Sequence, residues 1–231
     1  MCGLGELACH RGHGALGALN LLARAGLPVL GGTVVTCRAH REFLAGSGLG
    51  RYLSLKASSG EAPGGGAARG FASAPLGDAL QAAVCDALAS LGARSVAVLS
   101  EYGGRANLRT IPAVLDALRR IWLSPEGLKL QLEALSAGAK PPTWPVLLQR
   151  ELRTELTGWA AVTPRSRRPD LYGVRTAGTR SGRTPGLDEL LLGARDVFGE
   201  PLRLRWGLAE GELRILDVLP AGKETHDPRD L

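Results

Sequence analysis

The sequence predicts a mixed α/β (α+β) fold, because helical and strand periodicities alternate along a chain of 231 residues. Apolar residues recur at helical spacing between residues 187 and 198, and strict alternation of apolar and charged residues follows between residues 202 and 206. Residues 95–99 form a largely apolar run that is typical of a buried strand. A chain of this length is expected to form one large domain or two small lobes with a substantial core.

The first third of the chain predicts short elements separated by glycine-rich stretches. Residues 12–36 predict a glycine-led turn, a helix ending at Ala25–Gly26, and a strand that begins at Thr33. A second helix is expected from His40, and the glycines of residues 46–50 interrupt it. The stretch from Ser58 to Gly70 is rich in Gly, Ala and Ser, so we expect a flexible surface connection.

The middle of the chain predicts three helices and two strands. Leucine and valine residues at a spacing near four indicate a helix over residues 76–91, and the apolar strand of residues 95–99 follows it. Residues 111–122 form a second helical pattern, and a short helix is expected between Lys129 and Pro142. Residues 146–150 then indicate a strand.

The last third predicts a helix followed by a hairpin. Pro185 and Asp188–Glu189 suit the first turn of a helix over residues 187–198, where negative charge meets the helix dipole. Residues 202–206 form a half-buried strand, residues 209–211 turn the chain, and residues 213–218 return as a second strand. Between Pro164 and Pro185, where the chain is rich in Arg, Gly and Thr, we expect one strand at Tyr172 and Val174.

Composition excludes several classes of protein. No window approaches the run of roughly 18 apolar residues that a membrane-spanning helix needs. The N-terminal residues lack the basic and apolar regions of a secretion signal, which predicts a cytoplasmic protein. Cys2, Cys9, Cys37 and Cys85 are scattered, so reduced thiols are expected.

Two clusters of residues have side chains that could bind a metal ion or an anion. Cys2, Cys9, His10 and His13 lie close in sequence, but their spacing matches no common zinc motif, so no metal site is predicted. The net charge of +6 permits binding to nucleic acid or another acidic partner. The densest cluster of basic residues is Arg165, Arg167 and Arg168, and Tyr172 is the only aromatic residue near it in sequence. We therefore prefer to interpret this stretch as a solvated loop and not as an anion contact.

Five motifs in serial order resemble the N-terminal ATP-grasp (PEP/pyruvate-binding) domain of phosphoenolpyruvate synthase and pyruvate phosphate dikinase. They are Gly26–Val29 with Val34–Thr36, the Arg41–Leu44 helix, the helix of residues 111–122, the strand of residues 146–150 with Glu155–Gly158, and the closing segment 187–220. The resemblance covers nearly the whole chain with at least three deletions. It implies one degenerate ATP-grasp-like domain, residues 1–231, with two lobes around a cleft: N-terminal lobes over residues 1–140, a C-terminal lobe over 141–220, and a mobile tail over 221–231.

The same resemblance implies that the charged residues of the nucleotide site have been replaced. His13, or Ala15 if two residues are missing, stands where the family has a lysine, and Leu99 stands where it has an arginine. Arg203 and Arg205 replace an Asp-x-Glu pair, and Asp217 replaces a glutamine in the last strand. Gln149 is retained in the strand that lines the adenine pocket of the family.

These replacements predict loss of catalysis. A divalent ion about 4 Å from an arginine is repelled by roughly 8 kcal/mol at an effective dielectric constant near 20, before screening by salt. The leading hypothesis is therefore an inactive relative, a pseudoenzyme that acts as an adaptor, regulatory or assembly subunit for a protein partner, with no catalytic residue, cofactor or metal expected. The alternative is an active nucleotide-dependent phosphotransferase that binds ATP and Mg²⁺ with a rearranged site based on Arg203 and Arg205. A third hypothesis is polyanion or nucleic-acid binding through the loop that contains Arg165, Arg167 and Arg168.

Overall fold

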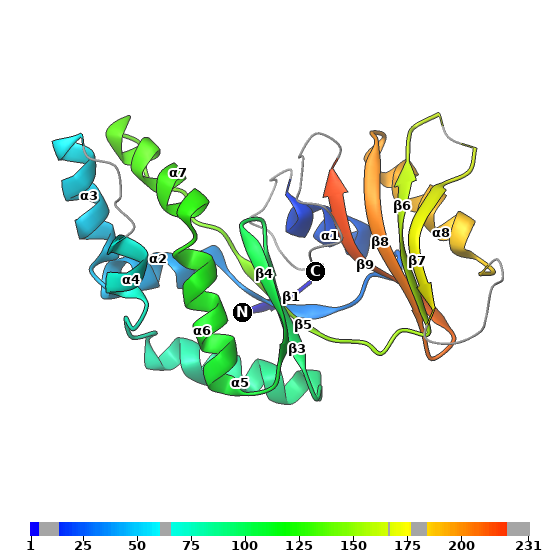
Figure 1. The fold of residues 1–231 in the computed structure, drawn as a ribbon, viewed down its shortest axis with the longest axis horizontal. Helices are drawn as coiled ribbons and strands as arrows, with labels where there is room; N and C mark the ends of the chain where they lie inside the picture. The colour runs from blue at the N-terminus through cyan, green and yellow to red at the C-terminus, as the bar shows by residue number, and fades with distance from the viewer. Residues whose placement is uncertain (5–13, 61–65, 166, 177–183, 221–231) are drawn as a thin grey trace. The chain divides into compact units, whose positions relative to one another are not determined.

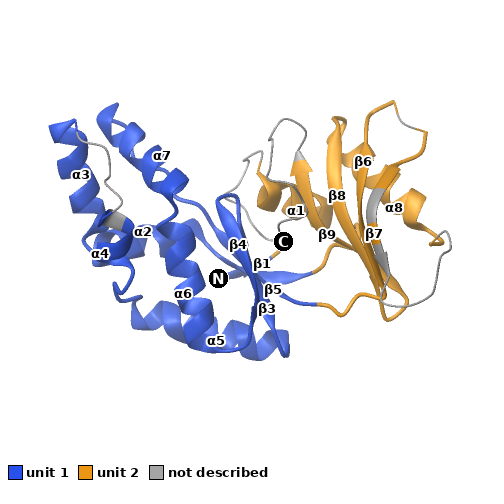
Figure 2. Ribbon diagram, in the orientation of Figure 1, with its two compact units in different colours: residues 1–3, 31–151 blue, residues 4–30, 152–231 orange. Residues whose placement is uncertain are grey.

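The structure is a computed structural model, and it describes residues 1–4, 14–60, 66–165, 167–176 and 184–220. The chain divides into two compact units (Figure 2): residues 1–3 and 31–151 form the first unit, and residues 4–30 and 152–231 form the second. Each unit contains one antiparallel sheet packed with helices (Figure 1), which confirms the predicted α/β (α+β) class. None of the described helices is long and apolar enough to cross a membrane.

The first unit is built on a five-stranded sheet with the strand order β1-β2-β5-β3-β4. The central strand β5 pairs antiparallel with both β2 and β3, and the outermost strand β4 forms a hairpin with β3. The strands are β1 (Cys2–Gly3), β2 (Gly32–Val35), β3 (Val96–Ser100), β4 (Gly103–Leu108) and β5 (Val146–Arg150).

Six helices of the described residues complete the first unit, and their apolar residues form one core with the sheet. They are α2 (Cys37–Gly46), α3 (Leu49–Ser59), α4 (Gly66–Phe71), α5 (Asp78–Leu91), α6 (Ile111–Trp122) and α7 (Pro125–Ser136). Side-chain caps fix two of the helix starts, because Thr110 Oγ1 accepts a hydrogen bond from Ala113 N and Ser124 Oγ accepts one from Gly127 N. The indoles of Trp122 and Trp144 are both buried in this core.

The second unit is a four-stranded antiparallel sheet with the strand order β7-β6-β8-β9. Its strands are β6 (Leu156–Val162), β7 (Asp170–Thr176), β8 (Leu202–Ala209) and β9 (Glu212–Pro220). The helix α1 (Ala15–Arg24) packs against β9, the helix α8 (Leu187–Phe198) packs against β6, and the two helices contact each other. Their leucines and the buried side chain of Trp206 form the core of this unit.

The predicted elements are largely confirmed, and the exceptions have physical causes. The stretch 58–70, predicted as a flexible connection, is wrong in part: α3 continues to Ser59, and residues 66–71 form the short helix α4. The strand β4 was not predicted, since five of its six residues are exposed and it shows no apolar alternation. Pairing with β3, a contact that sequence periodicity does not report, is what holds this segment extended.

The two units are defined by which strands pair and which helices pack together, and not by the order of the segments along the chain. The sequence assigned residues 1–140 and 141–220 to separate lobes, whereas β5 pairs inside the sheet of the first unit. Conversely, α1 packs in the second unit, and Ile215 of β9 exchanges backbone hydrogen bonds with Pro28 and Leu30 at 2.8 Å. The predicted mobile tail, residues 221–231, lies outside the described residues.

Candidate functional site on the second sheet

Strand alternation gives the sheet of the second unit two chemically different faces. Along β8, Leu202, Leu204 and Trp206 are buried with the helices, while Arg203 is partly exposed and Arg205 is exposed. Because successive side chains of a strand point to opposite faces, the two arginines project from the face opposite to the core formed with α1 and α8. We call the face that carries Trp159, Arg203, Arg205 and Asp217 the arginine face.

One cross-strand row lies at the centre of the arginine face. In the register of the sheet, Arg205 of β8 lies opposite Trp159 of β6 on one side and opposite Asp217 of β9 on the other. Residues directly opposite each other in an antiparallel sheet have Cβ atoms about 5 Å apart on the same face. The side chain of Trp159 is partly exposed, so this row sets an indole, a guanidinium and a carboxylate side by side.

Asp217 is in an environment that disfavours its charge. Burial raises the pKa of its carboxyl to about 6, although the backbone N–H of Val218 and the charge of Arg205 act in the opposite direction. The N–H of Val218 donates to Asp217 Oδ1 at 2.8 Å. The carboxylate therefore already has two partners on its own sheet, a hydrogen-bond donor and a cation.

These residues do not fit a magnesium ion. Mg²⁺ in nucleotide sites is held by carboxylates together with phosphate oxygens, and here the one carboxylate of the row faces a guanidinium. Within the described part of the chain, no group of three or more His, Cys, Asp and Glu side chains is arranged to hold a metal ion. The arginine face is therefore suited to bind an anion directly, because guanidinium groups match the geometry of carboxylates and phosphates.

Two of the positions singled out in the sequence lie in the first unit. Leu99 is a partly buried residue of β3 and lies opposite Leu147. Gln149 is buried on β5, between Gly32 of β2 and Ala97 of β3. The structure thus brings Arg203, Arg205 and Asp217 together on one sheet, and it brings Leu99 and Gln149 together on the other.

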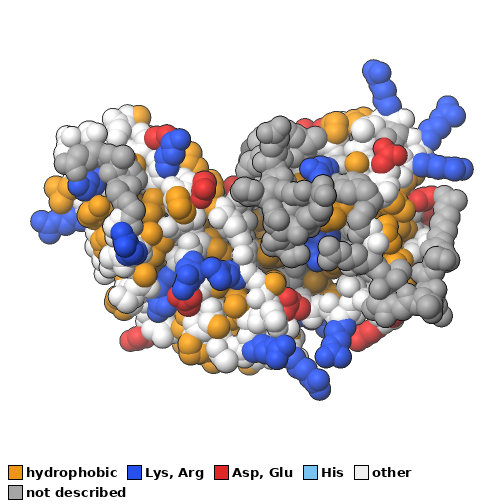
Figure 3. Space-filling model, viewed as in Figure 1, with side chains coloured by type: hydrophobic (Ala, Val, Ile, Leu, Met, Phe, Trp, Pro, Cys, Tyr) orange, Lys and Arg blue, Asp and Glu red, His pale blue; other side chains and the backbone are white. Residues whose placement is uncertain are grey.

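The remaining sequence candidates are placed only in part. Cys9, His10 and His13 lie outside the described residues, and Cys2, the described member of that cluster, is a residue of β1. Arg165, Arg167 and Arg168 are exposed in the loop between β6 and β7. Figure 3 shows Lys and Arg side chains projecting at this end of the second unit.

Sequence reasoning missed the most informative member of the face, Trp159. The indole belongs to β6, whose sequence Leu156–Val162 is interrupted by Gly158 and gives only a weak strand signal. Gly158 is small because it lies opposite the core residue Trp206, and a methyl group at Gly158 would come within 3.0 Å of that indole. The alternation of Gly158, Ala160 and Val162 with Trp159 and Ala161 was the signal that could have identified this strand.

Comparisons with known proteins give structural likenesses only. Neither a family model nor a curated protein sequence matches the chain. The D-alanine–D-alanine ligase of Coxiella burnetii is similar with a TM-score of 0.46 and 8% identity, over 88% of this chain and 46% of that one. A RimK domain ATP-grasp protein of Sphaerobacter thermophilus is similar with a TM-score of 0.44 and 13% identity, over 89% of this chain and 57% of that one.

A third similar structure is an N5-carboxyaminoimidazole synthase of Aspergillus clavatus, with a TM-score of 0.46 and 10% identity, over 89% of this chain and 43% of that one. The chain therefore spans about half the length of each of these structures.

Proposed function

We propose that this chain is an inactive relative of the ATP-grasp domain of phosphoenolpyruvate synthase and pyruvate phosphate dikinase, and that it acts as a non-catalytic adaptor, regulatory or assembly subunit in the cytoplasm. The serial motifs of the sequence support the relationship. The observation that carries the loss of catalysis is the pairing of Arg205 with Asp217. The position at which the resemblance requires a metal-binding carboxylate holds a cation, and the neighbouring carboxylate faces that cation.

The charges around Arg205 favour a loss of metal binding over a substitution that leaves metal binding intact. The carboxylate of Asp217 already accepts the N–H of Val218 and lies beside the charge of Arg205, so a divalent ion would have to compete with both for it. Arg203 lies two residues from Arg205 on the same face, so a divalent ion bound there would meet a second cation. Phosphoryl transfer in nucleotide-dependent enzymes depends on metal ions that neutralise the charge developing on the phosphates.

Isothermal titration calorimetry of the full chain with ATP, with and without Mg²⁺, tests this proposal. We expect no Mg²⁺-dependent increase in affinity and no release of ADP or phosphate. Micromolar binding that requires Mg²⁺, or nucleotide turnover that survives purification to constant specific activity, would contradict it. Purification from native cells followed by mass spectrometry tests the adaptor role, which predicts a protein that co-purifies in a fixed ratio.

The second candidate function is an active nucleotide-dependent phosphotransferase in which arginines replace part of the metal site. The projection of Arg203 and Arg205 from the same face as Trp159 favours it, since two guanidinium groups and an indole match the phosphates and the base of a nucleotide. This function predicts turnover that is lost in Arg203→Ala and in Arg205→Ala while the circular dichroism spectrum is unchanged. Equal turnover in wild type and both variants would eliminate it.

A further inference from the structure

The arginine face and the adjoining loop together carry several arginines and one partly exposed tryptophan. The sequence alone shows a cluster of arginines with few aromatic residues nearby. The fold adds an aromatic residue to these arginines, because the pairing of β6 with β8 places Trp159 beside Arg205. An indole beside a guanidinium group on a strand surface is a combination that binds the bases and phosphates of single-stranded nucleic acid.

The loop between β6 and β7 adjoins the end of the sheet at which Arg203 lies. Ala161 lies opposite Arg203, and the loop begins directly after β6 ends at Val162. Arg165, Arg167 and Arg168 therefore lie at the end of the sheet that carries Arg203, and all three are exposed. With a rise of about 3.3 Å per residue, the path from Arg205 through Arg203 to the loop covers on the order of 20 Å, the length of several nucleotides.

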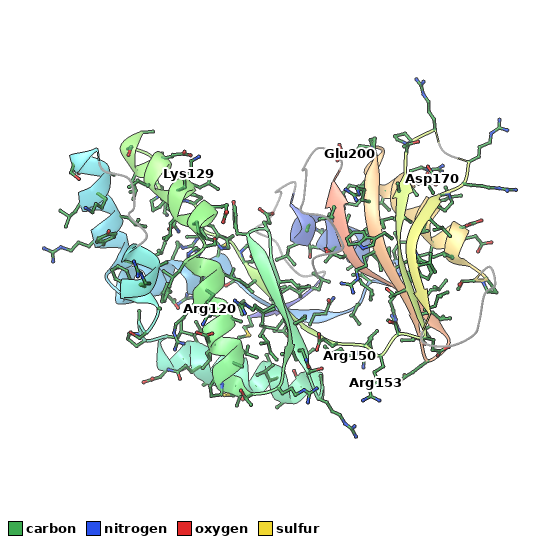
Figure 4. The ribbon with its side chains drawn as sticks, viewed as in Figure 1. Arg120, Lys129, Arg150, Arg153, Asp170 and Glu200 are labelled. Carbon is green, nitrogen blue, oxygen red and sulfur yellow. The ribbon has the colours of Figure 1, made fainter. Side chains whose placement is uncertain are left out.

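The acidic residues of this region leave an excess of positive charge. Asp217 lies opposite Arg205. Asp170 begins β7 opposite Ala161, and Glu200 precedes β8 (Figure 4). Compared with these three carboxyl groups, the face and the loop together carry five arginines: Arg165, Arg167, Arg168, Arg203 and Arg205. The surplus agrees in sign with the net charge of +6 for the whole chain.

We propose that the arginine face and the β6–β7 loop bind single-stranded nucleic acid, with Trp159 stacking on a base and the five arginines contacting the phosphates. A duplex fits this surface less well, because the bases of a duplex are stacked on each other and are not available to an indole on a flat sheet. A simple polyanion would use the arginines and leave Trp159 without a role. The proposal stands whether or not phosphoryl transfer has been lost, so it extends the proposed function and does not depend on it.

Fluorescence anisotropy of a labelled 12-nucleotide oligothymidylate, titrated with the full chain, tests the proposal. Each phosphate neutralised on a single strand contributes about −0.7 to the slope of log K against log salt, so five contacts predict a slope of about −3.5. Arg203→Ala and Arg205→Ala should each reduce this slope by about 0.7. Arg51→Ala, which removes an exposed arginine of α3 in the first unit, is the matched control and should leave the slope unchanged.

The variant Trp159→Leu distinguishes the contribution of base stacking to the binding affinity from the contribution of the positive charges. Loss of a base–aromatic contact weakens binding of the oligonucleotide by about five-fold or more, and the affinity for inorganic polyphosphate should be unchanged. Binding should also quench tryptophan fluorescence in the wild type and not in this variant, because Trp122, Trp144 and Trp206 are buried. An unchanged melting temperature establishes that the variant is folded, and Trp159→Phe should retain part of the affinity.

Several outcomes would overturn the proposal. They are absence of binding at 50 mM salt, equal loss of oligonucleotide and polyphosphate affinity in Trp159→Leu, equal behaviour of Arg203→Ala and Arg51→Ala, and tighter binding of duplex than of single strand. ATP titrated as a competitor distinguishes this site from that of the second candidate function: displacement of the oligonucleotide by micromolar ATP would assign the face to a mononucleotide instead.

Discussion

His40 is a buried histidine held between two tryptophans in the core of the first unit. Its ring stacks on Trp122 with centroids 5.1 Å apart and meets Trp144 edge-on at 4.3 Å. Its Nδ1 accepts a hydrogen bond from the backbone N–H of Trp144 at 3.2 Å. Burial lowers the pKa of His40 to about 3, and the histidine is therefore neutral in the folded protein at physiological pH.

The protonation of His40 predicts a loss of stability in acid. The unfolded chain binds a proton at its ordinary pKa of 6.5 and the folded protein only near 3, so the free energy of unfolding falls as the pH is lowered through this window. The slope is about 1.4 kcal/mol per pH unit. Urea denaturation at pH 7 and pH 5 should show this fall in the wild type and a much smaller one in His40→Gln. Equal pH dependence in both proteins would contradict the assignment.

Asp217 predicts the opposite dependence on pH. Its folded pKa near 6 lies above the ordinary value of 3.8, so the folded state binds more protons in this window and is destabilised above it. Asp217→Asn should therefore stabilise the protein at pH 8 by about 2 kcal/mol, and the difference should vanish at pH 3.5. Denaturant melts at the two pH values measure it. Destabilisation of Asp217→Asn at pH 8 would show instead that the contact with Arg205 outweighs the cost of burial.

The helix α7 is positioned by a close approach to Trp144. A methyl group at Gly127, in the first turn of α7, would come within 2.5 Å of two atoms of that buried indole. Alanine normally stabilises a helix relative to glycine by about 0.5–1 kcal/mol, but here the overpacked side chain should reverse the sign. We expect Gly127→Ala to destabilise the protein by about 2 kcal/mol in urea denaturation.

Gly46→Ala is the matched control for this prediction. Gly46 is the last residue of α2, and a methyl group there meets nothing within 4 Å. This variant should be neutral or slightly stabilising. If Gly127→Ala is also neutral, Trp144 moves aside at little cost and does not fix the position of α7.

The elements that the sequence predicted are those whose own residues bury a continuous apolar stripe. The helix over 111–122 and the closing helix and hairpin match α6, α8, β8 and β9 closely, because each presents regular apolar spacing to a core. The strand at Tyr172 and Val174 is also confirmed, as β7. The missed strands β4 and β6 have weak patterns of their own and owe their extended form to paired neighbours.

The candidate site was predictable only one strand at a time. Alternation along β8 placed Arg203 and Arg205 on one face, and this prediction needed no knowledge of the partners. Asp217 lies opposite Arg205 within the predicted β8–β9 hairpin, whereas the place of Trp159 beside Arg205 depends on register between strands far apart in sequence. Register is set by how whole strands bury their apolar faces, so no local pattern reports it.

The two units together predict a response to acid that neither shows alone. His40 lies in the first unit and Asp217 in the second, and their protonation acts on stability in opposite directions between pH 7 and pH 5. Acidification should therefore weaken the first unit while strengthening the second. Hydrogen exchange measured by mass spectrometry at the two pH values, corrected for intrinsic rates, resolves the units by their peptides. We expect protection to fall in peptides of α2, α6 and α7 and to rise in peptides of β8 and β9. A parallel change in both sets would show that the chain opens as one cooperative unit, in which the two ionisations largely cancel.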